Sequence, residues 1–276
     1  MKSFVFRERV FKLFSFGCSC NGQEPKEREP FVDLTVVLTN YCNAKCRFCL
    51  NEGRKRFSFD FDLFRHMFDE LSEKICINKI GLTGGEPTFE EENLFRCLDH
   101  VRGRCGLITV NTNGSRLKVL EDDRVERISI SRHHFDNEKN DEIFGVKIGN
   151  PLVGFSGKKK VILSCNLIRG YVDSVDGAYG MLDFAAENGI SEVAFVGLMK
   201  NNDFSKENII SPSLLNFGKD VLKYRELSYH TSGVCECSNH SYVSKSGKMV
   251  MFFMRHTKDH EFDKGSRIVW ANNRIM

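Results

Sequence analysis

The sequence predicts an α/β protein: a partial (β/α)6, TIM-like barrel with an N-terminal extension and a small C-terminal β extension. Three observations support this prediction. Short apolar runs rich in β-branched residues recur along the chain, which is typical of strands buried on both faces. Helical patterns lie between most of these runs, as in proteins with a parallel sheet. Small and polar residues follow five consecutive strands, and in a parallel barrel such residues share the rim where active sites occur.

The central part of the chain, residues 32–200, contains all six predicted strands. They lie at 34–38, 80–83, 107–110, 128–130, 161–163 and 193–196. Helices are predicted at 61–75 with Asp60 or Ser58 as cap, at 90–101, at 137–144, and at 174–187 with Asp173 as cap. The alternation predicts one parallel sheet with the helices outside it.

The flanking segments differ from this core. Residues 1–31 form an extension whose Phe-rich part we expect to pack on the main domain, with a membrane-surface helix as the alternative. Residues 17–30 have the composition of a linker. Residues 201–276 predict a helix at 212–227, a strand–turn–strand unit at 241–255 and a last strand at 267–270. We expect this tail to cover one end of the barrel.

The composition excludes several classes of protein. The chain has 276 residues, of which 41% are hydrophobic, enough to build a core and to exclude global disorder. The most apolar runs, such as 250–254, are far shorter than the roughly 20 residues that span a bilayer. Forty basic and 37 acidic residues leave a charge of +3. Neither a membrane nor a nucleic acid is therefore expected as a partner.

Cysteine usage points to a metal centre. The chain has 11 cysteines, an odd number, and is too long to need disulfide bonds. Arg7, Arg9 and Lys12 interrupt the apolar residues of the first twenty, so no secretory signal is visible and a reducing, cytoplasmic location is expected. Cys42, Cys46 and Cys49 follow the first strand. Three thiols at this spacing suit an iron–sulfur centre with one open metal position, whereas structural zinc takes four ligands.

The segment Cys42-Asn43-Ala44-Lys45-Cys46-Arg47-Phe48-Cys49 resembles the cysteine motif of the radical S-adenosylmethionine (radical SAM) superfamily. Gly84-Gly85-Glu86-Pro87 resembles that superfamily's second signature. The resemblance covers residues 33–199, continuing through Thr112-Asn113-Gly114 and Ser131. Asn166-Leu167-Ile168-Arg169-Gly170 resembles the subgroup of the molybdenum-cofactor cyclase. The cyclase activity itself is not expected, because the C-terminal cysteine triad spacing is missing and the chain ends Arg274-Ile275-Met276 in place of Gly-Gly.

The resemblance implies a [4Fe–4S] cluster on Cys42, Cys46 and Cys49, whose open iron binds the amino and carboxylate groups of SAM. An electron, from a donor such as flavodoxin or ferredoxin, would cleave SAM to a 5′-deoxyadenosyl radical. That radical would remove hydrogen from a small molecule: a cofactor precursor, nucleoside, sugar or natural-product intermediate. Two alternatives stay open: modification of a peptide or protein with the help of an auxiliary cluster, and a non-catalytic iron–sulfur or zinc protein.

The same resemblance implies roles for residues on the predicted rim. Gly84 and Gly85 would let the backbone approach the methionine moiety, Glu86 would accept a hydrogen bond from its ammonium group, and Pro87 would fix the loop. Phe48 is expected on the adenine. The remaining cofactor-binding candidates, for the ribose, the carboxylate or the rim in general, are Asn113, Ser131, Arg132 and Asn166.

Other candidates have two interpretations each. His133 and His134 are either catalytic, in substrate binding or proton transfer, or structural, bonded to Asp136 or to backbone, and at most one is expected to face the pocket. Two Cys-x-Cys pairs either form a second metal site or are unligated thiols; they are Cys18, Cys20, Cys235 and Cys237. The remaining cysteines are expected in the core: Cys76, Cys97, Cys105 and Cys165.

Overall fold

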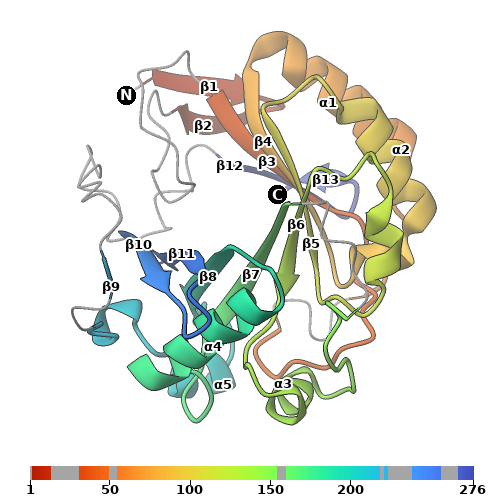
Figure 1. Cartoon of the computed structure of the whole chain (residues 1–276). Coiled ribbons are helices and arrows are strands. Elements are labelled where there is room, and N and C mark those ends of the chain that lie inside the picture. The colour runs from red at the N-terminus through yellow and green to blue at the C-terminus, as the bar shows by residue number, and fades with distance from the viewer. Residues whose placement is uncertain are drawn as a thin grey trace.

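A curved parallel sheet with helices on its outer face forms the centre of the molecule (Figure 1). A computed structural model describes residues 2–13, 31–49, 55–153, 160–217, 221–222, 238–255 and 267–276. The six predicted core strands are present, and neighbours in sequence pair in parallel. They are β3 (Phe31–Val37), β4 (Cys76–Thr83), β5 (Leu107–Thr112), β6 (Arg127–Ser131), β7 (Lys160–Leu167) and β8 (Glu192–Gly197). The predicted α/β partial barrel is confirmed.

The C-terminal tail extends both edges of this sheet. β12 (Arg267–Ala271) pairs in parallel with β3, and β13 (Arg274–Ile275) follows it. At the other edge β11 (Met249–Arg255) pairs in parallel with β8, followed by β10 (Ser238–Val243) and β9 (Val221–Leu222). The prediction that the tail covers one end of the barrel was therefore wrong. Its strands instead satisfy the backbone groups that β3 and β8 would leave unpaired.

Helices cover the outer face of the sheet. They are α1 (Phe61–Lys74), α2 (Glu91–Val101), α3 (Asn137–Phe144), α4 (Val175–Glu187) and α5 (Asp203–Asn208), with 3-10 turns η2 (Pro87–Phe89), η3 (Leu117–Glu121) and η4 (Pro212–Leu214). Asp60 caps α1 as predicted. The cap of α4 is Ser174, whereas Asp173 accepts a hydrogen bond from Gly170 N at 2.7 Å.

The predicted helix at 212–227 was wrong within the described part of that range. Only the three-residue turn η4 and the short strand β9 occur there. Leu215 is buried, and the ring of Phe217 lies 4.9 Å from that of Phe252. Packing of these side chains on the core outweighs the local helical pattern.

The N-terminal segment is a β-hairpin that packs on the barrel. β1 (Lys2–Phe6) and β2 (Arg9–Leu13) are antiparallel, joined at Arg7 and Glu8, whose φ angles of 47° and 64° are those of a tight hairpin turn. Phe6, Phe11 and Leu13 are buried in the main core. This confirms the expected packing and contradicts the alternative of a membrane-surface helix. The predicted linker, residues 17–30, lies outside the described residues.

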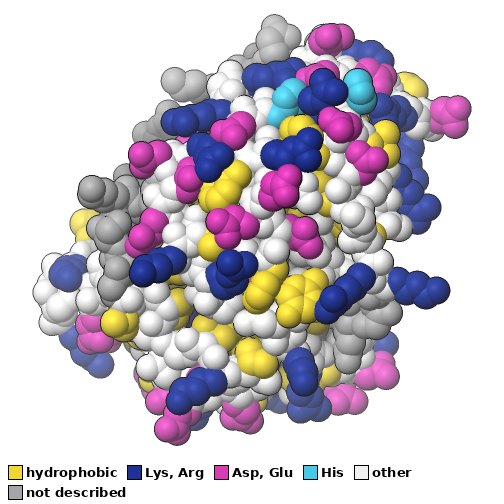
Figure 2. Space-filling view, turned by 90° about the vertical axis from the view of Figure 1, so that its right-hand side faces the viewer, with side chains coloured by type: hydrophobic (Ala, Val, Ile, Leu, Met, Phe, Trp, Pro, Cys, Tyr) yellow, Lys and Arg dark blue, Asp and Glu magenta, His cyan; other side chains and the backbone are white. Residues whose placement is uncertain are grey.

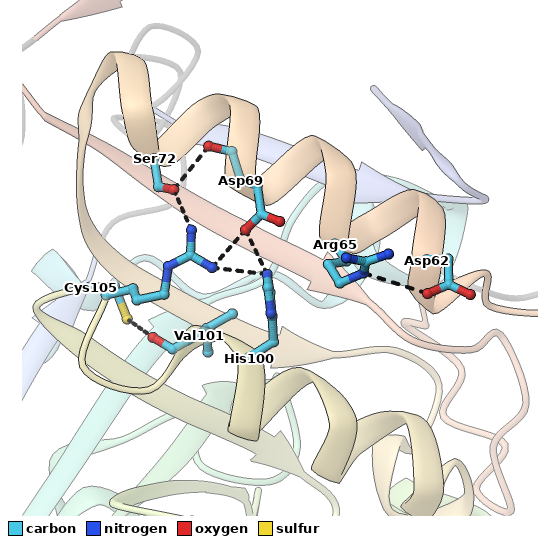
Figure 3. A network of polar contacts seen from close by, with 8 residues as sticks. Asp62, Arg65, Asp69, Ser72, His100, Val101 and Cys105 are labelled. Carbon is cyan, nitrogen blue, oxygen red and sulfur yellow. Dashed lines mark hydrogen bonds and ion pairs between the residues drawn. The ribbon is translucent and has the colours of Figure 1, made fainter.

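Polar contacts join α1 and α2 on the outside of the molecule. Asp69 accepts from Arg104 at 2.6 Å and contacts Nε2 of His100 at 2.8 Å, and Arg104 also donates to Ser72 (Figure 3). Basic and acidic side chains alternate over this whole face (Figure 2). None of the helices in the described part of the chain has the length and apolar composition that crossing a bilayer takes.

The cysteines that were predicted in the core differ in their burial. Cys97 and Cys165 are buried as expected, and Cys105 is half-buried against the core. Cys76 is exposed, contrary to the prediction, and it is the first residue of β4, at the amino end of that strand.

Candidate active site at the carboxyl edge of the sheet

The inner face of the sheet is polar and encloses a cavity of about 420 Å³. Alternate residues of the strands line it, among them Thr109 and Asn111 on β5 and Arg127 and Ser129 on β6. The intervening residues, such as Ile108 and Val110, pack in the core beneath the helices. Because side chains alternate along a strand, Ser131 and Asn166 continue the inner face up to the rim. Ser131 and Asn166 therefore lie on the same face of the sheet as the cavity, whose lining residues Lys79, Arg127 and Lys160 lie near the amino ends of β4, β6 and β7.

The loop with Cys42, Cys46 and Cys49 lies at this rim. Burial, the larger cause, and the neighbouring thiol of Cys49 raise the pKa of Cys46 to about 12, and the same two causes raise the pKa of Cys42. Such thiols become thiolates only when they bind a metal centre. Among the described residues no group closes around a single metal ion. Three cysteine thiols in one loop are the kind of ligand that iron–sulfur clusters use, each thiolate on a different iron atom.

The glycine loop is docked directly on the chain that leads into the cysteine loop. Gly85 N donates to Thr39 O at 2.7 Å, and Glu86 N donates to Tyr41 O at 2.8 Å. A Cβ on Gly84 would lie 2.6 Å from Thr39 O, and one on Gly85 would collide with the carbonyl of Tyr41. Approach to residues 39–41, in addition to any approach to SAM, therefore requires these glycines.

Glu86 makes contacts within the protein that the sequence did not predict. Its side chain is fully buried and accepts four hydrogen bonds, from Thr88 N, Thr88 Oγ1, Thr112 Oγ1 and Asn113 N, the last at 2.6 Å. Burial raises the pKa of this carboxyl, while these donors oppose the rise. The carboxylate ties the glycine loop to the end of β5, and its contact with the SAM ammonium stays a prediction. Pro87 begins the adjoining turn η2, as expected of a residue that fixes the loop.

Arg132 is also placed differently from the prediction. Its guanidinium donates to Gly149 O, Phe135 O and Asn137 Oδ1, and it lies 4.1 Å over the ring of Phe184. Arg132 follows Ser131, so its side chain turns to the opposite, helix-covered face of the sheet. The structure uses it to hold the segment around α3, not to pair with a carboxylate at the rim.

The two histidines separate as expected. His133 is buried, its Nδ1 accepts from Asn166 N at 3.0 Å, and its ring meets that of Phe48 edge-on at 5.1 Å. Burial lowers the pKa of His133 to about 3, so the imidazole is neutral. His134 accepts from Asp136 N and stacks on Phe135, which is the structural interpretation. Only His133 contacts the cysteine loop.

Sequence reasoning missed two side chains that hold this loop. Asn201 Nδ2 donates to Phe48 O at 3.3 Å and Cys49 O at 3.2 Å, and Asn202 Nδ2 donates to Arg47 O at 2.8 Å. Asn202 also caps α5, a helix that was not predicted. The Asn-Asn-Asp sequence at 201–203 is a cap signal that would have revealed the helix, although not its contact. Cys18, Cys20, Cys235 and Cys237 lie outside the described residues.

A parallel partial barrel with a three-cysteine loop and a glycine loop at its rim defines a class of enzyme. The model of the radical SAM superfamily matches residues 36–197, more than half of the chain, and the chain belongs to that superfamily. It is therefore a radical SAM enzyme, and its cofactors are a [4Fe–4S] cluster and SAM.

Its relatives include the GTP 3′,8-cyclase of Aquifex aeolicus (strain VF5), 30% identical over 230 residues, which are 73% of this chain and 68% of that protein. A probable GTP 3′,8-cyclase of Thermoplasma volcanium is 24% identical over 84% of this chain and 74% of its own length. Among solved structures, Streptococcus suis SuiB bound to S-adenosylmethionine has a TM-score of 0.53 at 18% identity, over 64% of this chain and 43% of that one. The last similarity shows a shared fold.

Proposed function

We propose that the substrate of this enzyme is a small molecule of the nucleotide type, whose phosphate groups enter the cavity inside the barrel. The observation that carries the proposal is the basic lining of that cavity. Lys79, Arg127, Lys160 and Arg255 all contribute to it, and it extends to Ser164, which pairs with Ser131 at the rim. Phosphates in the cavity would leave the rest of the substrate below the cysteine loop.

The charge balance in the cavity favours an anion. Arg127 and Lys160 share one carboxylate, that of Glu192, at 2.7 and 2.9 Å. Burial, together with Arg255, Arg267 and Arg127, lowers the pKa of Lys79 to about 8, although Asp33 opposes the shift. Among the described side chains that shift the pKa of Lys79, three are cations and one, Asp33, is an anion. A polyanion would relieve this repulsion, since buried cations bind phosphate through charge-assisted hydrogen bonds. The GTP named for the relatives is a polyanion of this kind.

In this proposal the remaining residues of the rim bind the cluster and SAM. Cys42, Cys46 and Cys49 hold the cluster. Phe48, the backbone of the glycine loop, Ser131 and Asn166 would hold SAM. Bound together, cluster and SAM supply the 5′-deoxyadenosyl radical that removes hydrogen from the substrate. The chain orients the reactants, and neutral His133 supports the ring of Phe48 without adding a charge.

The test uses protein reconstituted anaerobically with iron and sulfide. GTP binding is measured by equilibrium dialysis, with guanosine as the uncharged comparison, and 5′-deoxyadenosine is measured after reduction with SAM present. Lys79→Met should weaken GTP binding at least tenfold and leave guanosine binding unchanged. Lys118→Met, at an exposed residue of η3, is the matched control. Equal GTP affinity in both variants, or 5′-deoxyadenosine formation stimulated by a peptide and not by nucleotides, would refute the proposal.

We propose further that an acidic electron carrier such as flavodoxin or ferredoxin docks at the cysteine loop, in a reducing cytoplasm. Lys45 and Arg47 flank Cys46 and are exposed, as are Lys55 and Arg56. The guanidinium of Arg47 is supported by the ring of Phe204 at 4.4 Å. Association of a carrier with such a surface weakens with salt. Cluster reduction rates that do not change between low and high ionic strength would contradict this docking.

A further inference from the structure

Asn113 approaches the sulfur of a predicted cluster ligand. It is the first residue after β5, it is buried, and its Nδ2 lies 3.7 Å from Cys42 Sγ and 2.9 Å from Asn43 Oδ1. The distance to sulfur is that of an N–H···S hydrogen bond. The side chain was predicted to bind SAM, but these contacts direct its amide nitrogen to the cysteine loop.

The orientation of this amide is fixed by its surroundings. Ser115 N donates to Asn113 Oδ1 at 2.9 Å, and a backbone N–H can only donate. The oxygen must therefore face Ser115, which places the NH₂ group toward Cys42 and Asn43. An amide nitrogen has two hydrogens, one for each of these acceptors.

The backbone of Asn113 is held independently of its side chain. Asn113 N donates to Glu86 Oε2 at 2.6 Å, and Glu86 Oε1 accepts from Thr112 Oγ1 at 2.8 Å. A substitution at position 113 leaves this backbone contact in place. The donor is thus positioned before any cluster binds, and its removal need not move the loop.

We propose that Asn113 is a positioning residue that hydrogen-bonds Cys42 Sγ and so raises the reduction potential of the cluster. The inference rests on the proposed assignment of the cluster to Cys42, Cys46 and Cys49. Reduction adds negative charge that the ligand sulfurs share, and an N–H donor stabilises the more negative state. Ala44 N gives Cys42 Sγ a second donor at 3.4 Å, but it belongs to the backbone and is common to every variant. Asn113 is the donor that mutation can remove.

The test is potentiometric titration of the reconstituted protein without SAM, followed by the EPR signal of the reduced cluster, after iron has been counted. Asn113→Ala should give a midpoint potential more negative than wild type. Asn43→Ala removes the other acceptor of the same amide but not the contact with Cys42, so its potential should stay at or above the wild-type value. Asn113→Ser is the second variant, because its hydroxyl can accept from Ser115 N but is too short to reach the sulfur.

Three outcomes overturn the proposal in distinguishable ways. Unchanged potentials in both Asn113 variants would show that the hydrogen bond does not act on the cluster. Equal negative shifts in Asn113→Ala and Asn43→Ala would assign the effect to loop position. A full cluster in Cys42→Ala would show that Cys42 is not a cluster ligand. The hydrogen bond from Asn113 to its sulfur could then not act on the cluster.

Discussion

Replacing Gly85 with alanine should separate the glycine loop from the chain that leads into the cysteine loop. A Cβ there would collide with the carbonyl of Tyr41 and lie 2.8 Å from Asn40 O, and backbone atoms cannot rotate away. The loop must shift, weakening the hydrogen bonds Gly85 N to Thr39 O and Glu86 N to Tyr41 O. At roughly 1 kcal/mol for each bond and about 1–3 kcal/mol of overpacking strain, the unfolding free energy should fall by about 3–5 kcal/mol.

Urea unfolding of the apoprotein measures this loss, and iron content after reconstitution measures its effect on the cluster. Gly81→Ala, on β4 just before the glycine loop, is the matched control, since its Cβ would meet only Asn111 Nδ2, at an ordinary 3.5 Å. Gly85→Ala should also bind less iron than Gly81→Ala. If the two variants unfold within about 0.5 kcal/mol of each other and bind equal iron, the docking argument is refuted.

Three further predictions concern side chains around the same rim. His133 stays neutral in the folded state because its pKa is about 3, while in the unfolded chain it takes up a proton below about pH 6.5. The free energy of unfolding should therefore fall as the pH drops from 6.5, by about 2 kcal/mol at pH 5. His133→Gln should remove this part of the pH dependence, and a profile parallel to wild type would contradict the prediction. The double variant Asn201→Ala/Asn202→Ala loses the hydrogen bonds that hold the cysteine loop, and it should release iron to a chelator roughly tenfold faster than the control Asn208→Ala. The bond lost in the control lies within α5. A tenfold difference corresponds to about 1.4 kcal/mol of lost hydrogen bonding. Arg132→Met removes the buried donor to the half-buried carbonyls of Gly149 and Phe135 and should cost about 2 kcal/mol in urea unfolding, with SAM affinity preserved. Weakened SAM binding at unchanged stability would return Arg132 to the site.

The strands of the barrel and the cysteine loop could be predicted because their signals are local. Ile128 and Ile130 mark a buried strand by themselves, and three cysteines in eight residues bring their thiols together whatever the rest of the chain does. The edge pairing of β11 and β12 could not be predicted, because nothing in either segment specifies which strand it joins. Long-range pairing is a property of the whole sheet.

The contacts of single residues at the rim could not be predicted, for a related reason. Ser131 and Arg132 are neighbours in sequence, yet one continues the inner face and the other contacts Phe184 on the outer side. Glu86 accepts hydrogen bonds from Thr112 and Asn113 at the end of β5, a segment well separated from it in sequence. Motif spacing identifies which residues gather at the rim, while the donors that surround each side chain decide what it does there.

The placement of β12 beside β3 has a consequence for the order in which the protein is made. Chain synthesis proceeds from the N-terminus at roughly 5–20 residues per second, so β3 is complete on the order of ten seconds or more before its partner exists. During that interval Val32, Leu34 and Val36 belong to a strand with an open parallel edge, and β8 awaits β11 in the same way. A nascent or truncated chain that stops before Met249 therefore leaves the backbone groups of β3 and β8 unpaired, so that either strand could pair with another chain. Its solubility in the cell should depend on chaperones until residues 267–276 have been synthesised.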